Sequence, residues 1–351
     1  AQGAELTYET DGQTFHLALS FESQGGAPFF GQPLFTVEVR EDQVRGQVSS
    51  SRVFVDNGGG VDKKNEFLAL VDHYEVTTTP CGGITLLQID ETCIPTTSNA
   101  AIEAIPSYHT EQLKEGEGDV IWTIYIKNVD TLRLHHTVKI MRIPVVTLTE
   151  NDYPMATIDD LNALLDTLAH EADRKSVYIL QLPAVTYEGG LTMKNFCCDL
   201  IGSESGTTFT GTVTIATRGI HPSNITNVRF VGDGTGIGLS ASEGAFLHRC
   251  TFENWEIGAY GGLGSWVNAT GCTFRGNGVG LWLDNRGGAT CSGSYYGDSV
   301  YEDNGTAVRI AAMPGTETLD FNNCVFRGNG VNVENAAGYA VDLSQIVTVE
   351  N

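Results

Sequence analysis

A string of twelve residues that nearly recurs constrains the fold of this chain more than any other feature. The string CTFRGNGVGLWL at residues 272–283 nearly returns as CVFRGNGVNVEN at residues 324–335. An aromatic residue marks the same place in each related unit, at steps of 22, 22, 27 and 25 residues: Phe230, Phe252, Phe274, Tyr301 and Phe326. A period of roughly 20 to 50 residues indicates a solenoid or a propeller. Because these units are short, rich in Gly and without helical spacing, we predict a parallel β-helix whose coils bury their faces by stacking.

Three further columns follow from aligning the units on the aromatic residue. The positions two before it are small: Val228, Cys250, Cys272, Ser299 and Cys324. The positions five before and seven after it are mostly apolar: Ile225, Leu247, Ala269, Tyr296 and Phe321, then Ile237, Ala259, Leu281, Val308 and Val333. Inward columns at even spacing are what pleated strands produce. The cysteines are therefore predicted as buried free thiols, although a rung spacing of about 4.8 Å also permits a disulfide between neighbours. A stacked column does not bring together the ligands of a zinc site.

One amphipathic helix precedes the repeat. Residues 157–174 read TIDDLNALLDTLAHEADR, with apolar residues recurring on one helical face. Thr157 stands at the N-cap position, and Asp160 three residues later is a capping-box partner. We expect this helix to cap the first coil.

The first 150 residues follow a different pattern. Apolar and polar positions alternate between turn clusters, which predicts strands at residues 35–40, 66–76, 120–129 and 134–143 and no long helix. We expect a β-sandwich-like domain over residues 1–150, a linker over residues 144–154, and a β-helix domain over residues 151–351. Cys81 and Cys93 close a short loop, where they either pair or stay free.

The C-terminal part resembles a known superfamily. The helix, then VYILQLPAVTYEG at residues 177–189, LIGSE at residues 200–204 and the C-x-F-x-x-N-G-V rungs are similar to pectin lyase-like right-handed parallel β-helices, over residues 155–351. The resemblance implies an all-β fold, a right-handed parallel β-helix with an N-terminal helix cap. Many members process acidic polysaccharides, and others are phage tailspikes or surface adhesins. Enzymes of the superfamily usually work on the outer face of one sheet, which the resemblance places on the strand after the aromatic residue and its turn.

That strand carries the candidate carbohydrate-binding residues Tyr260, Trp282, Asp284, Arg309 and Glu334. Tyr260 beside Trp282 would offer a flat apolar platform for a sugar ring, and the three charged residues would bind hydroxyls or a carboxylate. The small residues Gly258, Gly280, Ala307 and Asn332 would leave a shallow floor beside them. The alternative is that a loop or the first domain covers this face.

The catalytic patterns implied by the resemblance do not match. One such pattern has an Asp-Asp pair on the strand after the aromatic residue, but the single Asp-Asp pair of this chain, Asp159 and Asp160, falls on the capping helix. Lyase-like members need clustered carboxylates for Ca²⁺ and an Arg, and here Asp284 and Arg309 are neighbours on adjacent rungs without such a cluster. Asp284 and Glu334 are two rungs apart, within the roughly 5 to 9.5 Å that separate the carboxyl groups of glycosidases. Asp284, Arg309 and Glu334 are therefore the catalytic candidates. Ca²⁺ stays open as a cofactor, and no metal site is predicted.

Two more columns have structural explanations. One position after the aromatic residue the charges alternate, which predicts a surface ladder of ion pairs: Val231, Glu253, Arg275, Glu302 and Arg327. Turn asparagines at positions 277, 304 and 329 predict a hydrogen-bonded ladder between coils.

The net charge and hydropathy of the chain limit the classes of binding partner. A formal net charge of −23 lacks the electrostatic footprint of a nucleic-acid-binding protein. The sequence has no stretch of 18 or more consecutive apolar residues, so it predicts no membrane span. The first residues, AQGAEL, suit either a mature secreted or cell-surface protein or a piece cut from a longer chain. The final segment shows no closing cap, so we expect more chain, a partner subunit that forms an oligomer through that end of the β-helix, or a last segment that folds over the end. We expect a glycan-binding or adhesive module whose partner is a polysaccharide. The alternatives are a polysaccharide lyase or glycoside hydrolase, and a non-catalytic structural spike or spacer.

Overall fold

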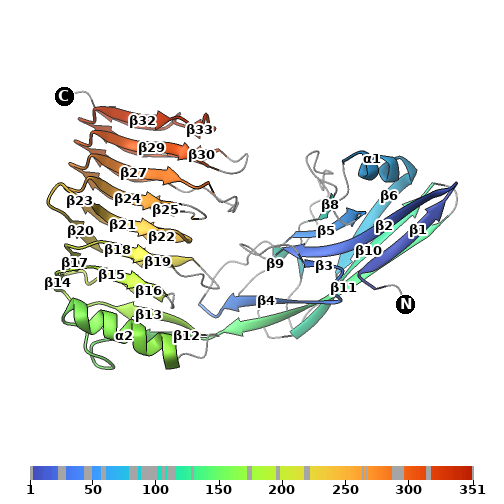
Figure 1. The fold of residues 1–351 in the computed structure, drawn as a ribbon, viewed down its shortest axis with the longest axis horizontal. Coiled ribbons are helices and arrows are strands. Elements are labelled where there is room, and N and C mark those ends of the chain that lie inside the picture. Colours follow the sequence, from blue (N-terminus) through green and yellow to red (C-terminus); the bar gives the residue numbers. More distant parts are fainter. Residues whose placement is uncertain are drawn as a thin grey trace. The chain divides into compact units, whose positions relative to one another are not determined.

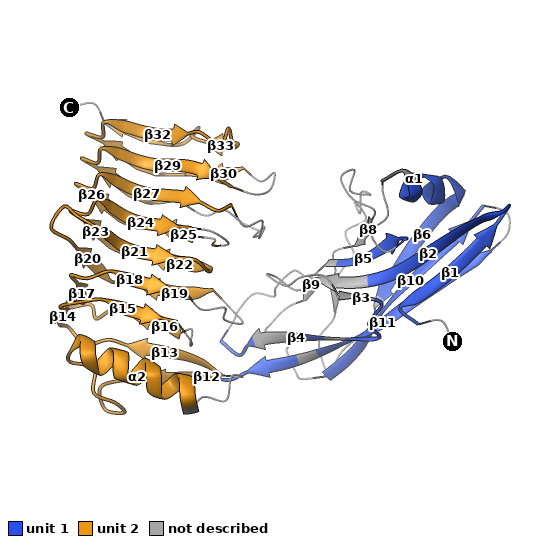
Figure 2. Cartoon of the chain, viewed as in Figure 1, with its two compact units in different colours: residues 1–144 blue, residues 145–351 orange. Residues whose placement is uncertain are grey.

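The computed structural model describes residues 3–22, 29–42, 50–56, 61–78, 86–87, 101–104, 107–108, 116–127, 130–171, 176–194, 198–216, 222–262, 265, 267–286, 296–313 and 318–349. The chain divides into two compact units, residues 1–144 and residues 145–351 (Figure 2). Cys81 and Cys93 lie outside the described residues. In the described part, no helix has the length and apolar character needed to cross a membrane.

The N-terminal unit is built from small sheets and one helix. Its elements are β1 (Glu5–Thr10), β2 (Gln13–Glu22), β3 (Phe29–Phe30), β4 (Leu34–Arg40), β5 (Ser50–Val55), α1 (Val61–Leu70), β6 (Val71–Thr78), β7 (Leu86–Leu87), β8 (Ala101–Ala104), β9 (Ser107–Tyr108), β10 (Gly116–Ile126) and β11 (Thr131–Ile143). One sheet has the order β1-β2-β5-β8 with β3 paired to β2, and another has the order β4-β11-β10-β6. Pairing is antiparallel except between β4 and β11. Both sheets contribute to one hydrophobic core, and the indole of Trp122 on β10 donates a hydrogen bond to Ser51 Oγ on β5 (2.9 Å).

One expectation for this unit was wrong. Residues 66–76 were predicted as a single strand, but the chain is helical in α1 up to Leu70 and extended only from Val71 in β6. A short apolar run fits either state, so tertiary packing decides. Phe67 is fully buried against Phe15 of β2, with ring centroids 5.4 Å apart. The ammonium of Lys63 lies 4.6 Å from the centre of the same Phe15 ring. These contacts hold the segment as a helix.

A buried histidine in this unit makes its stability depend on pH. Burial, helped by the neighbouring His135, lowers the pKa of His136 to about 4, against an ordinary value of about 6.5. The unfolded chain therefore binds the proton more readily between pH 6.5 and 4, and stability falls as the pH falls through that window. We expect a loss of about 3 kcal/mol from this residue alone.

Urea unfolding tests that expectation in a variant in which the other tryptophans are replaced. Tryptophan emission then comes only from Trp122, in this core. The His136→Gln variant should lose most of the slope between pH 6.5 and 4. The adjacent His135→Gln variant, at a half-buried position, should keep it. Equal slopes in the two variants would contradict the assignment to His136.

The C-terminal unit is a parallel solenoid of about seven coils (Figure 1). The first sheet contains β12 (Val145–Leu148), β13 (Val177–Gln181), β16 (Cys198–Ile201), β19 (Ser223–Thr226), β22 (Ala245–His248) and β25 (Val267–Thr270). The second sheet contains β14 (Thr186–Tyr187), β17 (Thr208–Phe209), β20 (Arg229–Val231), β23 (Thr251–Glu253), β26 (Thr273–Arg275), β28 (Val300–Glu302), β31 (Val325–Arg327) and β34 (Val347–Val349). The third sheet contains β15 (Leu191–Met193), β18 (Val213–Ile215), β21 (Ile237–Ala241), β24 (Ile257–Gly261), β27 (Val279–Asp284), β29 (Thr306–Ala312) and β32 (Val331–Asn335). β30 (Leu319–Asp320) pairs with β33 (Val341–Asp342).

At the start of the solenoid, the predicted linker is wrong and the predicted capping box is confirmed. Residues 144–154 were expected to be a linker, but β12 within them pairs in parallel with β13 and is the first strand of the solenoid. The predicted cap is α2 (Ile158–Glu171), which lies at the β13 end of the stack in Figure 1. Its capping box is reciprocal, because Asp160 N donates to Thr157 Oγ1 (3.2 Å) and Thr157 N donates to Asp160 Oδ2 (2.9 Å). Leucines from α2 enter the solenoid core.

The predicted aromatic column is confirmed on the second sheet. Phe230, Phe252, Phe274, Tyr301 and Phe326 pair in register, and their successive rings stack with centroids 4.5 to 5.0 Å apart. The column also reaches back to Phe209 and Tyr187, which the alignment missed. The small column is confirmed as well, because all five of its members are buried.

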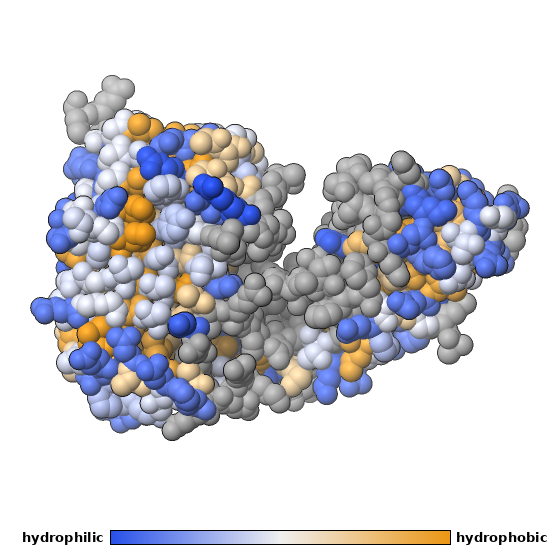
Figure 3. Space-filling model, in the orientation of Figure 1, coloured by the Kyte–Doolittle hydropathy of each residue, from blue (hydrophilic) through white to orange (hydrophobic). Residues whose placement is uncertain are grey.

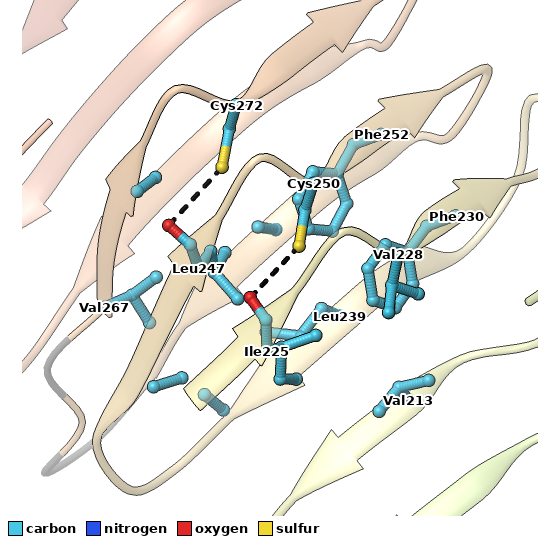
Figure 4. Close-up of a cluster of buried hydrophobic side chains, with 14 of the residues drawn as sticks. Val213, Ile225, Val228, Phe230, Leu239, Leu247, Cys250, Phe252, Val267 and Cys272 are labelled. Atoms are coloured by element: carbon cyan, nitrogen blue, oxygen red, sulfur yellow. Dashed lines mark hydrogen bonds between the residues drawn. The ribbon is translucent and has the colours of Figure 1, made fainter. Parts of the chain in front are cut away.

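The three predicted thiols are free and buried. Each donates to a backbone carbonyl of the preceding coil: Cys250 Sγ to Ile225 O (3.3 Å), Cys272 Sγ to Leu247 O (3.5 Å) and Cys324 Sγ to Tyr296 O (2.9 Å). Figure 4 shows the first two bonds. Burial raises the pKa of Cys324 to about 11, so this thiol stays protonated at neutral pH. The column therefore works as small core residues that also satisfy carbonyls.

Both polar ladders exist, one of them in part. Arg275 Nε and an Arg327 terminal nitrogen bond the two oxygens of Glu302 (2.8 and 2.7 Å), and these bonds lower the pKa of Glu302. The ladder does not continue as predicted, because Glu253 forms its ion pair with Arg229 of the preceding coil, at 3.6 Å. The asparagine ladder is complete: Asn277 N donates to Asn304 Oδ1 and Asn304 N to Asn329 Oδ1, each at 3.0 Å.

Candidate functional site

The predicted column lies in register across four strands of the third sheet. Tyr260 on β24 pairs with Trp282 on β27, Trp282 pairs with Arg309 on β29, and Arg309 pairs with Glu334 on β32. None of the four belongs to the solenoid core. These residues, together with Asp284 and Arg286, are called the Trp282 face below.

The two aromatic rings do not form the expected flat platform. Their planes are at 87°, with centroids 5.6 Å apart. The Tyr260 hydroxyl donates to Asp284 Oδ2 (3.2 Å), which directs the ring along its own strand. A Cβ at Gly262 would lie 2.8 Å from this ring, so the glycine makes room for it. Burial, and then the charge of Asp284, raise the pKa of Tyr260, which keeps the phenol a donor.

Arg309 covers the indole of Trp282. Its guanidinium carbon lies 4.8 Å from the ring centre, at the distance of a cation–π contact. Its Nε donates to Glu334 Oε2 (2.8 Å), so the glutamate fixes the arginine over the ring. Within the described part of the chain, the Trp282 indole nitrogen is buried and has no hydrogen-bond acceptor.

Asp284 does not pair with Arg309 as the rung order implied. The register between β27 and β29 shifts after Leu283, so that Asp284 stands opposite Ala312. Its partners are Tyr260 and Arg286, whose Nε lies 2.8 Å from Asp284 Oδ1. The Asp284 side chain is 12% exposed and that of Arg286 is 68% exposed. The sequence analysis did not predict Arg286 as a site residue. The only signal for it in the sequence was its position two residues after Asp284.

The expected floor of small residues was wrong. Gly258 and Gly280 face the interior, because a Cβ at either would lie 3.1 to 3.2 Å from the Cβ of a stacked phenylalanine and 2.6 Å from a backbone oxygen. Ala307 in the same column is fully buried. Another register column of the same sheet holds aliphatic residues, of which Val279 is buried: Ile237, Ile257, Val279 and Val331. Figure 3 shows a hydrophobic strip across successive rungs of the solenoid.

The catalytic candidates are therefore split into two pairs, Asp284 with Arg286 and Arg309 with Glu334. Each carboxylate forms an ion pair with a guanidinium group, with a nitrogen–oxygen distance of 2.8 Å in both pairs. Among the described residues, no group of three or more His, Cys, Asp or Glu side chains could hold a metal ion. The arrangement offers paired charges and an aromatic edge.

Comparisons with known proteins support the fold. Residues 200–351 match the family model described as "Right handed beta helix region". This match confirms the predicted right-handed β-helix over residues 200–351. Among solved structures, the chain is similar to the Family 28 exopolygalacturonase of Yersinia enterocolitica, with 10% identity, 81% of this chain and 78% of that chain covered, and a TM-score of 0.21. So distant a likeness carries no argument about activity. The comparison with curated proteins found no match.

Proposed function

We propose that this right-handed β-helix protein binds a carbohydrate through the Trp282 face and acts outside the cell or at its surface as a glycan-binding or adhesive module. The observation that carries the proposal is Trp282 itself. A tryptophan outside the core, in line with a tyrosine and flanked by paired charges, is the composition of a sugar-binding surface. A hydroxyl that displaces Arg309 would give the indole nitrogen the acceptor that it lacks.

The charges favour a neutral glycan over an acidic one. The net charge of −23 repels polyanions at long range. Both arginines of the face already bond carboxylates of the same chain, so a uronic acid would have to compete with Asp284 and Glu334 for them. The paired side chains are also held in place before binding, which reduces the entropy lost on association.

Three further parts belong to the proposal. The N-terminal unit is a β-sandwich-like domain, supported by the core that its two sheets share. Association through the last rung is supported by Val331 and Val347, which are 46% and 52% exposed. The runner-up functions are a depolymerase, favoured only by the carboxylates Asp284 and Glu334, and a structural spike, which would leave the Trp282 face without a ligand.

The test is a glycan array with the full chain, followed by titration calorimetry on the best ligand. Trp282→Ala should weaken binding about 30-fold, because the loss of a central aromatic contact costs about 2 kcal/mol. The control is Val300→Ala, a half-buried residue on β28 of the second sheet, which should leave the affinity unchanged. Binding that survives Trp282→Ala, or no bound glycan on the array, would contradict the proposal. Mass spectrometry of the incubated ligand would reveal shortened products if the protein were a depolymerase.

A further inference from the structure

A depression lies on the N-terminal unit, separate from the Trp282 face. It has a volume of about 600 Å³ and opens where β6 begins and β10 ends. Its lining consists of Asp72, His73, Tyr125, Ile126, Lys127, Asp130 and Thr131. These residues come from three neighbouring strands and the turn between β10 and β11, so the sheet fixes their backbone positions.

A β-bulge and a ring stack shape one wall. The register between β10 and β6 shifts at Tyr125, which leaves Asp72 as an extra residue on β6. Asp72 Oδ2 and His73 Nδ1 lie 2.8 Å apart. The His73 ring stacks on Tyr125, with centroids 4.2 Å apart and planes at 13°. Tyr125 in turn donates its hydroxyl to Glu75 Oε2 (3.2 Å). Partners at both ends therefore hold this aromatic pair in place.

The free charge of the depression is negative. Among the described residues of its lining, Lys127 is the one lysine or arginine, and the Lys127 Nζ donates to the Ala69 carbonyl at the end of α1 (2.9 Å). This bond directs the ammonium group to the C-terminus of the helix, where a cation is stabilised. The carboxylates of Asp72 and Asp130 remain in the lining, with Glu75 next to the stacked pair.

We propose that this depression binds a sugar carrying a protonated amine, with the ring against the His73 and Tyr125 stack and the ammonium group against Asp72 and Asp130. Aromatic faces attract both the C–H face of a pyranose and a cation. Carboxylates form charge-assisted hydrogen bonds with ammonium donors. An acidic sugar would meet two like charges, and an N-acetylated sugar would lose the ion pairs. The site is separate from the proposed function of the Trp282 face.

The test uses the full chain and two probes with the same sugar backbone, a glucosamine tetramer with protonated amines and its fully N-acetylated, neutral form. Calorimetry at roughly 0.15 M salt screens the long-range attraction of the acidic protein for any cation. The glucosamine tetramer should bind at least 10-fold more tightly than the acetylated one. Asp130→Asn and Tyr125→Leu should each weaken it at least 10-fold, and Asp130→Glu should restore most of the affinity.

Three outcomes would overturn the site. These are equal affinity for the two tetramers, unchanged binding in Asp130→Asn, and equally tight binding of spermine, which carries the charge without the ring. Val300→Ala, on β28 of the second sheet and outside both proposed sites, is the matched control and should leave binding of the glucosamine tetramer unchanged. Because the two surfaces are tested by different variants and ligands, a failure of one is distinguishable from a failure of the other.

Discussion

Asn304→Ala should lower the free energy of unfolding of the solenoid by about 3 kcal/mol, because several buried polar groups lose their partners at once. Asn304 is 2% exposed and forms the centre of the ladder. Its Oδ1 accepts from Asn277 N and Nδ2 (both 3.0 Å), and its Nδ2 donates to Phe274 O (2.9 Å) and Asn329 Oδ1 (3.0 Å). Alanine leaves each of these groups unpaired where water has little access. Urea unfolding in a Trp122→Phe background gives tryptophan emission from the C-terminal unit alone.

The matched control is Asn329→Ala at the end of the same ladder. Asn329 makes comparable bonds, to Asn304, Tyr301 O and Asn332, but it is only half-buried. Water can replace an accessible partner, so we expect a loss of about 1 kcal/mol. If both variants lost the same amount, burial of the ladder would not be what makes Asn304 costly to remove.

Phe274→Ala should cost the solenoid about 4 kcal/mol, the usual penalty for emptying a buried phenylalanine site. The ring is fully buried between Phe252 and Tyr301, both 5.0 Å away and within 7° of parallel. The neighbours cannot close the space, because the spacing of the backbone rungs fixes their positions at about 4.8 Å. The same unfolding measurement in the Trp122→Phe background reports the loss. A cost below about 1 kcal/mol would show that the stack collapses freely.

Tyr301→Phe is the control within the same stack. In the described part of the chain, the Tyr301 hydroxyl is buried without a hydrogen-bond partner, and burial raises its pKa far above the ordinary value. Removing an unsatisfied buried hydroxyl should therefore be neutral or stabilise the solenoid by up to about 1 kcal/mol. A large loss in this variant would mean that the hydroxyl has a partner, and the interpretation of the stack would need revision.

The repeat predicted the solenoid because its core is encoded one coil at a time. Each rung lies directly on the next, so a residue type that recurs at the same place in every coil stacks on the same type in the neighbouring coil. This is why Phe274 falls between Phe252 and Tyr301, why Cys272 is buried, and why Asn304 lies between Asn277 and Asn329. The capping box of α2 was readable for a related reason, since Thr157 and Asp160 are local partners.

The candidate sites depended on contacts that no period encodes. The sequence placed Tyr260, Trp282, Arg309 and Glu334 in one column, but their rotamers follow from side-chain partners. The bond from Tyr260 to Asp284 turned the expected platform into perpendicular rings, and the register shift after Leu283 removed Asp284 from Arg309. In the N-terminal unit, where nothing repeats, the packing of Phe67 favoured a helix, and a bulge at Asp72 shaped the depression. Sequence alone determined which residues stack, because stacking repeats along the chain. Tertiary structure decided how Tyr260, Arg309 and Glu334 point, because each of them is held by a partner on another coil.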